Sequence, residues 1–132
     1  MARKKVLILC TGNSARSQIA EGLLKHETNQ ELNVFSAGVE PRPLNPLAVE
    51  VMKEIDIDIS EQRSKDVAEV FHEPFSWVIT VCDSAREKCP IFPGAHVIHW
   101  DIKDPQTIED FRNVRDELKG RVTEFVDTVA NS

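Results

Sequence analysis

The apolar residues of this chain follow two kinds of pattern, short unbroken runs and stretches with helical spacing. The first run, residues 6–9, ends at small and polar residues. Apolar side chains then recur every three or four positions from Ser17 until the pattern fades near Thr28. An unbroken run indicates a strand buried on both faces, and the recurrence indicates an amphipathic helix. The chain is therefore predicted to begin with a strand, a polar loop and a helix.

The same two patterns predict the rest of the secondary structure. Asn45 suits the N-cap of a helix whose first position is Pro46. A long helix is expected after Pro105, with apolar side chains at helical spacing as far as Val129. Runs rich in β-branched and aromatic residues predict further strands. These strands cover residues 33–37, 76–81 and 95–100, and a short helix is expected at about residues 65–70.

This order of elements predicts an α/β fold, a three-layer sandwich in which a four-stranded parallel sheet has helices on both faces. In such a sheet the carboxyl ends of all strands share one edge, where ligands bind. Cys10, Cys82 and residues 101–104 each follow the end of a strand. We therefore expect these residues around one pocket, which Ser36 near the end of the second strand can join.

Length, charge and cysteine count narrow the class of protein. A chain of 132 residues is enough for one domain, residues 1–132, with a core of its own. The net charge of -6 argues against a nucleic-acid or membrane partner. The apolar run after the basic residues 3–5 is too short for a signal peptide or a bilayer span, which predicts a cytoplasmic location. The cysteines number 3, and an odd count does not indicate a disulfide framework.

The candidate chemistry lies in the loop at residues 10–17, which reads CTGNSARS. Gly12 and Asn13 tolerate positive φ, so the turn can curl and direct its N–H groups into one anion-binding concavity at the start of the helix. Cys10 faces the positive end of that helix, which is expected to lower the thiol pKa and make the sulfur a nucleophile. Arg16 can hold two oxygens of a tetrahedral oxyanion. The alternative is a buried free cysteine beside a turn with a surface arginine.

A cysteine followed after five residues by Arg16 and Ser17 resembles the active-site loop of low-molecular-weight protein tyrosine phosphatases and of the arsenate reductases that share their fold. The sequence SQIAEG at residues 17–22 is more similar to the reductases, because phosphatases usually carry proline where this chain has Gln18. The resemblance extends along almost the whole chain and implies the low-molecular-weight phosphatase-like fold. It also implies arsenate or phosphate as the bound oxyanion. The expected oxyanion-binding residues are Thr11, Gly12, Asn13, Ser14, Ala15 and Arg16.

Cys82 and Cys89 are separated by six residues. In a helix they would lie two turns apart, roughly 10 Å, so pairing them requires the segment to unwind. From the residues alone, an alternative without redox chemistry is equally well supported. In this alternative Cys82 is a small residue at a buried strand end and Cys89 has no role in the site. The resemblance implies more, because thioredoxin-coupled arsenate reductases carry cysteines at both places. It implies that Cys10 attacks arsenate, Cys82 attacks Cys10, and Cys89 then attacks Cys82 to form a disulfide that thioredoxin reduces.

Two further residues are assigned supporting roles. Ser17 can donate its hydroxyl to the Cys10 thiolate and stabilise it. Asp104 is the candidate general acid, which protonates the leaving oxygen and needs a pKa raised by partial burial. Its Asp-Pro sequence matches the acid motif of the family. The alternative is an aspartate that caps the following helix, and Asp101 is the second choice for the acid.

No cofactor and no metal are expected, because the histidines show no ligand spacing with the cysteines. Some thioredoxin-coupled reductases bind potassium through residues that here are Asn13, Glu21 and Ser36, together with the loop after the second helix. This loop contains Arg63 and Lys65, and two basic side chains argue against a monovalent-cation site there. Either side chain can replace the positive charge of the ion.

Two other functions remain open at this point. A low-molecular-weight phosphatase would use Cys10, Arg16 and Asp104 in the same way through a phosphocysteine. Such phosphatases often carry aromatic residues after the acid, where this chain has Gln106 and Thr107. The missing aromatic residues and the cysteine pair favour reduction of arsenate. A third possibility, from a different class, is a non-catalytic oxyanion sensor or a thioredoxin-partner protein.

Overall fold

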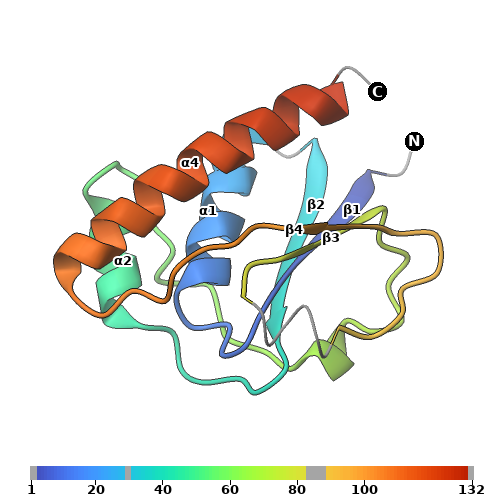
Figure 1. Cartoon of the computed structure of the whole chain (residues 1–132), viewed down its shortest axis with the longest axis horizontal. Helices are drawn as coiled ribbons and strands as arrows, with labels where there is room; N and C mark the ends of the chain where they lie inside the picture. Colours follow the sequence, from blue (N-terminus) through green and yellow to red (C-terminus); the bar gives the residue numbers. More distant parts are fainter. Residues whose placement is uncertain (1–2, 29–30, 83–88, 131–132) are drawn as a thin grey trace.

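A computed structural model of the chain describes residues 3–28, 31–82 and 89–130. Its elements follow the predicted order closely (Figure 1). They are β1 (Lys4–Cys10), α1 (Arg16–Thr28), β2 (Leu32–Gly38), α2 (Pro46–Lys53), the 3₁₀ turn η1 (Val67–Glu69), β3 (Trp77–Thr80), β4 (His96–His99) and α4 (Ile108–Ala130). The predicted cap of α2 is also confirmed, since the Leu47 backbone N–H donates to Asn45 Oδ1 at 2.9 Å.

The strands form one parallel sheet in the order β2-β1-β3-β4, which confirms the predicted α/β fold class. β1 lies inside the sheet and residues 6–9 are fully buried, which explains their unbroken apolar run. Because the strands are parallel, their carboxyl ends meet at one edge. Cys10 at the end of β1 is the register partner of Gly38 at the end of β2, and Leu9 pairs with Thr80 at the end of β3.

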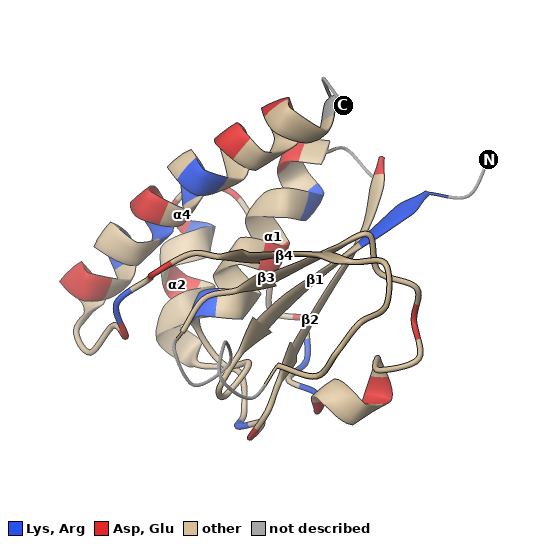
Figure 2. Ribbon diagram, turned by 45° about the vertical axis from the view of Figure 1, so that its right-hand side comes forward, with Lys and Arg blue, Asp and Glu red and all other residues tan. Residues whose placement is uncertain are grey.

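The two faces of the sheet are covered differently. Helices α1, α2 and α4 pack against one another on one side, and η1 lies on the other (Figure 2). The short helix predicted near residues 65–70 is present as the single 3₁₀ turn η1. Phe35, which alternates along β2 with the α1-facing Ser36, makes an edge contact with Phe75 at 5.4 Å between ring centroids, and Phe75 contacts Phe92 at 5.5 Å. Aromatic packing thus covers the face that the long helices leave open. No helix in the described part of the chain has the length and apolar character needed to cross a bilayer.

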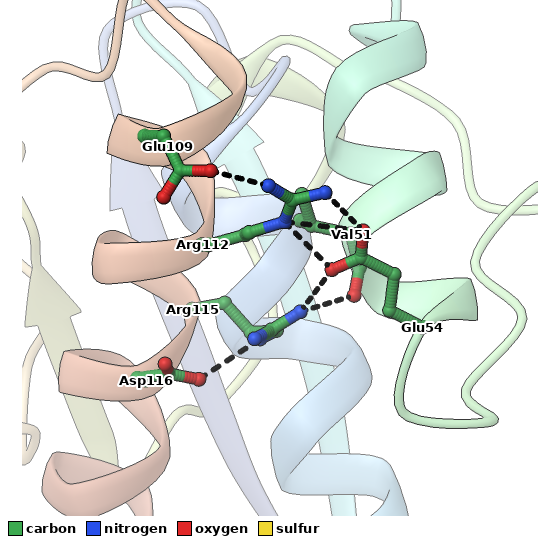
Figure 3. Close-up of polar contacts among 6 residues, drawn as sticks. All are labelled: Val51, Glu54, Glu109, Arg112, Arg115 and Asp116. Atoms are coloured by element: carbon green, nitrogen blue, oxygen red, sulfur yellow. Dashed lines mark hydrogen bonds and ion pairs between the residues drawn. The ribbon is translucent and has the colours of Figure 1, made fainter.

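A charged cluster joins the carboxyl end of α2 to α4 (Figure 3). The Glu54 carboxylate accepts hydrogen bonds from Arg112 Nη2 at 2.9 Å and from Arg115 Nη1 at 2.7 Å. Arg115 Nη1 also donates to the Val51 carbonyl at 2.9 Å. The bonds from Arg112 and Arg115 lower the pKa of Glu54 to about 2. This cluster fixes α2, and with it the segment that precedes α2, against the last helix.

Replacing Glu54 by glutamine is expected to lower the thermal unfolding midpoint at pH 7 by a few degrees. The folded-state pKa of about 2 lies below the ordinary value of 4.5, so the stabilisation is complete above the ordinary value and is lost as the pH falls through the folded one. The difference in unfolding midpoint between parent and variant should therefore have its full size of a few degrees at pH 7 and be close to zero near pH 2. Circular dichroism melts at both pH values measure it. Glu50→Gln, on an exposed position of α2, is the control, and equal midpoints for both variants at pH 7 would contradict the prediction.

Candidate active site

The loop from Cys10 to Arg16 is held from outside by the segment after β2. Backbone N–H groups of this segment donate to the loop carbonyls. The pairs are Val39 to Cys10 at 3.2 Å, Glu40 to Thr11 at 2.8 Å, Arg42 to Gly12 at 2.8 Å and Asn45 to Ser14 at 2.8 Å. In a trans peptide the N–H points opposite to the preceding carbonyl. The loop amides that follow these carbonyls are therefore turned away from the segment and into the loop.

Asn13 fixes the shape of the loop. It has a φ of 49° and is fully buried, so the predicted positive φ is confirmed at this residue. Its Nδ2 donates to Ser17 Oγ at 2.8 Å and to Ser36 Oγ at 2.9 Å, and its Oδ1 accepts from the Lys65 backbone N–H at 2.9 Å. Gly12, in contrast, does not adopt a positive φ. Asn13 alone supplies the left-handed turn, and its side chain ties the loop to two neighbouring segments.

Gly38 allows β2 to approach the loop. A Cβ atom on this residue would lie 2.7 Å from the Thr11 carbonyl oxygen and 3.0 Å from the Asn13 backbone nitrogen. Backbone atoms cannot move aside cheaply at such distances, so only glycine fits here. The sequence marks Gly38 only as a strand end, and nothing in the pattern of neighbouring residues reveals this contact.

A cavity of about 230 Å³ opens above the loop. It is lined by Cys10, Thr11, Gly12, Ser14, Ala15, Arg16, Arg42 and Asp104. Of the predicted oxyanion-binding residues, only Asn13 is absent from this lining, because its side chain is directed into the protein. Arg42 is a lining residue that sequence reasoning missed. The sequence offers one indication of this role, namely that Arg42 is a basic residue shortly after the carboxyl end of β2.

Arg16 connects the loop to the segment after β4. Its Nη1 donates to the Ile102 carbonyl at 2.8 Å, and its Nη2 lies 3.7 Å from Asp104 Oδ1. Asp104 thereby reaches the cavity, as the sheet topology predicts. The expected partial burial is wrong, however, because 66% of the Asp104 side chain is exposed. Asp101 is exposed and does not line the cavity.

The start of α4 does not use Asp104 as a cap. The Asp110 carboxylate accepts from the backbone N–H groups of Gln106 at 3.0 Å and Thr107 at 3.2 Å. Thr107 Oγ1 accepts in return from the Asp110 N–H at 3.1 Å. Asp104 instead accepts from Gln106 Nε2 at 3.2 Å. The alternative in which Asp104 only caps the helix is therefore not what the structure shows.

Cys82 lies beside Cys10, as the shared strand edge predicts. Both thiols are buried, and the Cys82 side chain makes a hydrogen bond with Cys10. Cys82 Sγ is also in a hydrogen bond with Thr11 Oγ1 at 3.0 Å. Ser17, which was expected to stabilise the Cys10 thiolate, accepts instead from Asn13 and so helps to hold the loop. Cys10 lines the cavity, and Cys82 lies directly beside it.

This contact reverses the expected direction of the Cys10 pKa. The hydrogen bond with Cys82 and burial raise the pKa of Cys10, and they outweigh the lowering by Arg16 and by the Thr11 backbone N–H. The expected lowering of the Cys10 pKa is therefore wrong. The helix dipole favours the thiolate, but the second thiol in contact with Cys10 favours the protonated form and has the larger effect.

Replacing Cys82 by alanine is expected to lower the pKa of Cys10, because it removes the largest cause of the rise. Alkylation of Cys10 by iodoacetamide, followed by mass spectrometry across pH, should show a midpoint at lower pH than in the parent. Cys89→Ser is the matched control, since Cys89 is not among the groups that act on Cys10. A midpoint that stays at the parent's value in Cys82→Ala would contradict the prediction.

The family model described as low molecular weight phosphotyrosine protein phosphatase matches residues 5–132. The chain belongs to this family. The match begins one residue after the start of β1 and includes the cavity, both flanking segments and α4. The predicted membership of the phosphatase family is thus confirmed.

Individual members of the phosphatase family that are similar to this chain include arsenate reductases. Arsenate reductase 1 of Staphylococcus haemolyticus is 42% identical over 98% of this chain and 99% of its own length. The solved structure of an arsenate reductase in the phosphate binding state has a TM-score of 0.87 and 34% identity, covering 95% of this chain and 98% of that one. A thioredoxin-dependent arsenate reductase of Corynebacterium glutamicum has a TM-score of 0.80 and 30% identity, covering 97% of this chain and 62% of that one.

This phosphatase-family chain places cationic side chains next to a buried carboxylate behind the loop. Glu21 is buried, and it accepts hydrogen bonds from Ser36 Oγ and Lys25 Nζ. Lys65 is half-buried and its Nζ donates to the Arg63 carbonyl at 3.2 Å. Burial lowers the pKa of Lys65 although the charge of Glu21 opposes this. Lys25 and Lys65 therefore supply positive charge near Glu21.

Cys89 is half-buried, and its Sγ donates to the Pro90 carbonyl at 3.4 Å. Burial raises the pKa of its thiol. The segment that joins Cys82 to Cys89, and with it the expected helical spacing of the pair, lies outside the described residues. All three cysteines are free thiols in this structure.

Proposed function

We propose that this protein is an arsenate reductase that works through Cys10, Cys82 and Cys89. One observation carries the proposal, namely that the Cys82 thiol lies against Cys10, the cysteine that lines the cavity. A phosphatase that hydrolyses a phosphocysteine uses water at this stage and has no need of a second thiol. The similarity of nearly the whole chain to arsenate reductases supports the same conclusion.

In the first step the loop amides and Arg16 hold the arsenate oxygens. The thiol proton of Cys10 passes to an arsenate oxygen, and the resulting thiolate attacks the arsenic atom. The Cys10 sulfur forms a bond to arsenic, the bond from arsenic to the opposite oxygen breaks, and the oxygen departs as water after protonation. Asp104, at the rim of the cavity and 3.7 Å from Arg16, is the group placed to supply that proton. Arsenic remains in its +5 state in the resulting adduct.

In the second step the Cys82 sulfur attacks Cys10. A disulfide forms between the two residues, the bond from sulfur to arsenic breaks, and its electron pair reduces arsenic from +5 to +3, so that arsenite leaves. This step requires the two sulfurs to be neighbours, as they are here. Cys89 then attacks Cys82, which frees Cys10 and leaves a disulfide between Cys82 and Cys89.

The last step needs an external dithiol to reduce that disulfide, and we assign this role to thioredoxin. The thioredoxin-dependent arsenate reductase among the similar structures supports the assignment. The proposed relay needs free thiols, which suits a reducing compartment and the expected cytoplasmic location. No resident cofactor takes part in these steps, because the electrons come from the cysteines.

The second candidate is a low-molecular-weight phosphatase, which would use the same cavity with Cys10, Arg16 and Asp104. The family itself favours this candidate. The lining of the cavity does not, because none of the described residues that form it is aromatic and could stack on the ring of an aryl phosphate. A non-catalytic sensor would bind the oxyanion without any turnover.

A side-by-side assay tests the proposal. The protein is given arsenate with thioredoxin, thioredoxin reductase and NADPH in one reaction, and an aryl phosphate in another. We expect arsenate-dependent NADPH oxidation and at most weak release of phosphate. Efficient hydrolysis of the aryl phosphate without NADPH oxidation would overturn the reductase in favour of the phosphatase. Phosphate binding without either activity would identify a sensor.

A further inference from the structure

The charges around the oxyanion cavity are not balanced. Arg16 is engaged through Nη1 with the Ile102 carbonyl and faces the Asp104 carboxylate through Nη2, so its charge is partly neutralised. Arg42 lines the same cavity, and its guanidinium has no ion pair or hydrogen bond within the described part of the chain. The whole chain carries a net charge of -6. Arg42 is therefore the uncompensated positive charge at the mouth of a cavity in an otherwise acidic protein.

Local backbone contacts fix where Arg42 stands. Its N–H donates to the Gly12 carbonyl at 2.8 Å. Its side-chain Cδ and Cγ lie 3.5 Å and 3.7 Å from the position that a Cβ on Gly12 would occupy, so the aliphatic stem crosses the loop. Pro41 fixes its own φ, and Pro43 restricts Arg42 to extended conformations. The backbone that carries the Arg42 side chain is thus restrained at the rim of the cavity.

We propose that Arg42 is a second oxyanion-recognition residue, which draws the anion into the cavity and binds an oxygen that faces its mouth. The loop amides and Arg16 hold the oxygens near the floor, where Cys10 attacks. An oxygen at the rim needs a separate donor, and the planar guanidinium of Arg42 suits this task. The inference builds on the proposed function in taking arsenate as the reacting anion, but it applies equally to phosphate, which has the same shape.

The test compares Arg42→Ala and Arg42→Lys with Arg63→Ala. Arg63 is the matched control because it lines only the neighbouring groove with Arg42, where it pairs with Glu69 at 3.1 Å, and does not reach the oxyanion cavity. Steady-state kinetics give kcat and KM for arsenate with the thioredoxin system at low and high salt. Titration calorimetry with inorganic phosphate gives affinity without turnover, and thermal melts confirm that each variant is folded.

For Arg42→Ala we expect KM for arsenate and Kd for phosphate to rise about tenfold or more, the usual size of a hydrogen bond to a charged group, with kcat within about twofold of the parent. Arg42→Lys should recover part of the affinity, and the salt dependence of KM should flatten in Arg42→Ala. Unchanged affinities in Arg42→Ala, or an equal loss in Arg63→Ala, would overturn the assignment. If Arg42→Ala weakens phosphate binding but the parent reduces no arsenate, the recognition role stands and the reductase function fails.

Discussion

A Cys10→Ser protein is expected to form no detectable arsenite, a loss of at least about 10⁴-fold relative to the parent. Cys10 is the only sulfur that lines the described cavity, and it lies at the end of β1 directly below the loop amides. A serine hydroxyl is a much weaker nucleophile, and it forms no bond that Cys82 can break by disulfide exchange. Both the first and the second step of the reaction are therefore lost.

The same variant should still bind the oxyanion. The backbone contacts that hold the loop and the guanidinium of Arg16 do not involve the Cys10 side chain. Arsenite is measured by chromatography, phosphate affinity by calorimetry, and folding by a thermal melt. Arsenite production by Cys10→Ser at a rate near that of the parent would show that the attacking sulfur has been misassigned.

A Cys89→Ser protein is expected to release one arsenite per chain and then stop. Cys10 and Cys82 are already in contact, so the attack on arsenate and the reduction of arsenic are both complete without a third thiol. Cys10 and Cys82 are both buried, so an external reductant has poor access to a disulfide between them. A rapid-quench experiment with excess arsenate and thioredoxin measures the burst, and mass spectrometry after digestion identifies the disulfide.

Cys82→Ser provides the comparison for this experiment. It keeps Cys10 and Cys89 but removes the sulfur that lies next to Cys10, so it should give no burst of arsenite. Sustained turnover in both Cys82→Ser and Cys89→Ser would contradict the relay. A burst in Cys89→Ser and none in Cys82→Ser would establish the order in which the two cysteines act.

Much of the fold follows from short-range pattern. The run at residues 6–9 predicts a strand buried on both faces because no polar side chain interrupts it, and Asn45 with Pro46 predicts the start of α2 because both act on the first turn alone. The juxtaposition of Cys10 and Cys82 follows from topology, since parallel strands that follow one another in this way must end at a common edge.

Properties that depend on contacts across the fold were missed or predicted wrongly. Arg42 stands between two prolines and is exposed, as expected for a turn residue. Its place at the cavity depends on a backbone hydrogen bond to Gly12, which the sequence does not reveal. The direction of the Cys10 pKa depends on the nearness of one other sulfur. The exposure of Asp104 depends on how α4 begins, which Asp110 and Thr107 decide.

The backbone hydrogen bonds from the segment after β2 to the loop carbonyls also affect selectivity between anions. Because these hydrogen bonds hold the loop whether or not an anion is bound, the loop can adjust its shape only a little to the anion. Arsenate and phosphate are tetrahedral anions of nearly the same size. Affinity therefore offers weak discrimination, and the choice falls to redox chemistry, because thiols reduce pentavalent arsenic but leave phosphorus unchanged. Phosphate would therefore compete with arsenate for the cavity, so the rate of arsenate reduction would depend on the ratio of the two anions and not on the arsenate concentration alone.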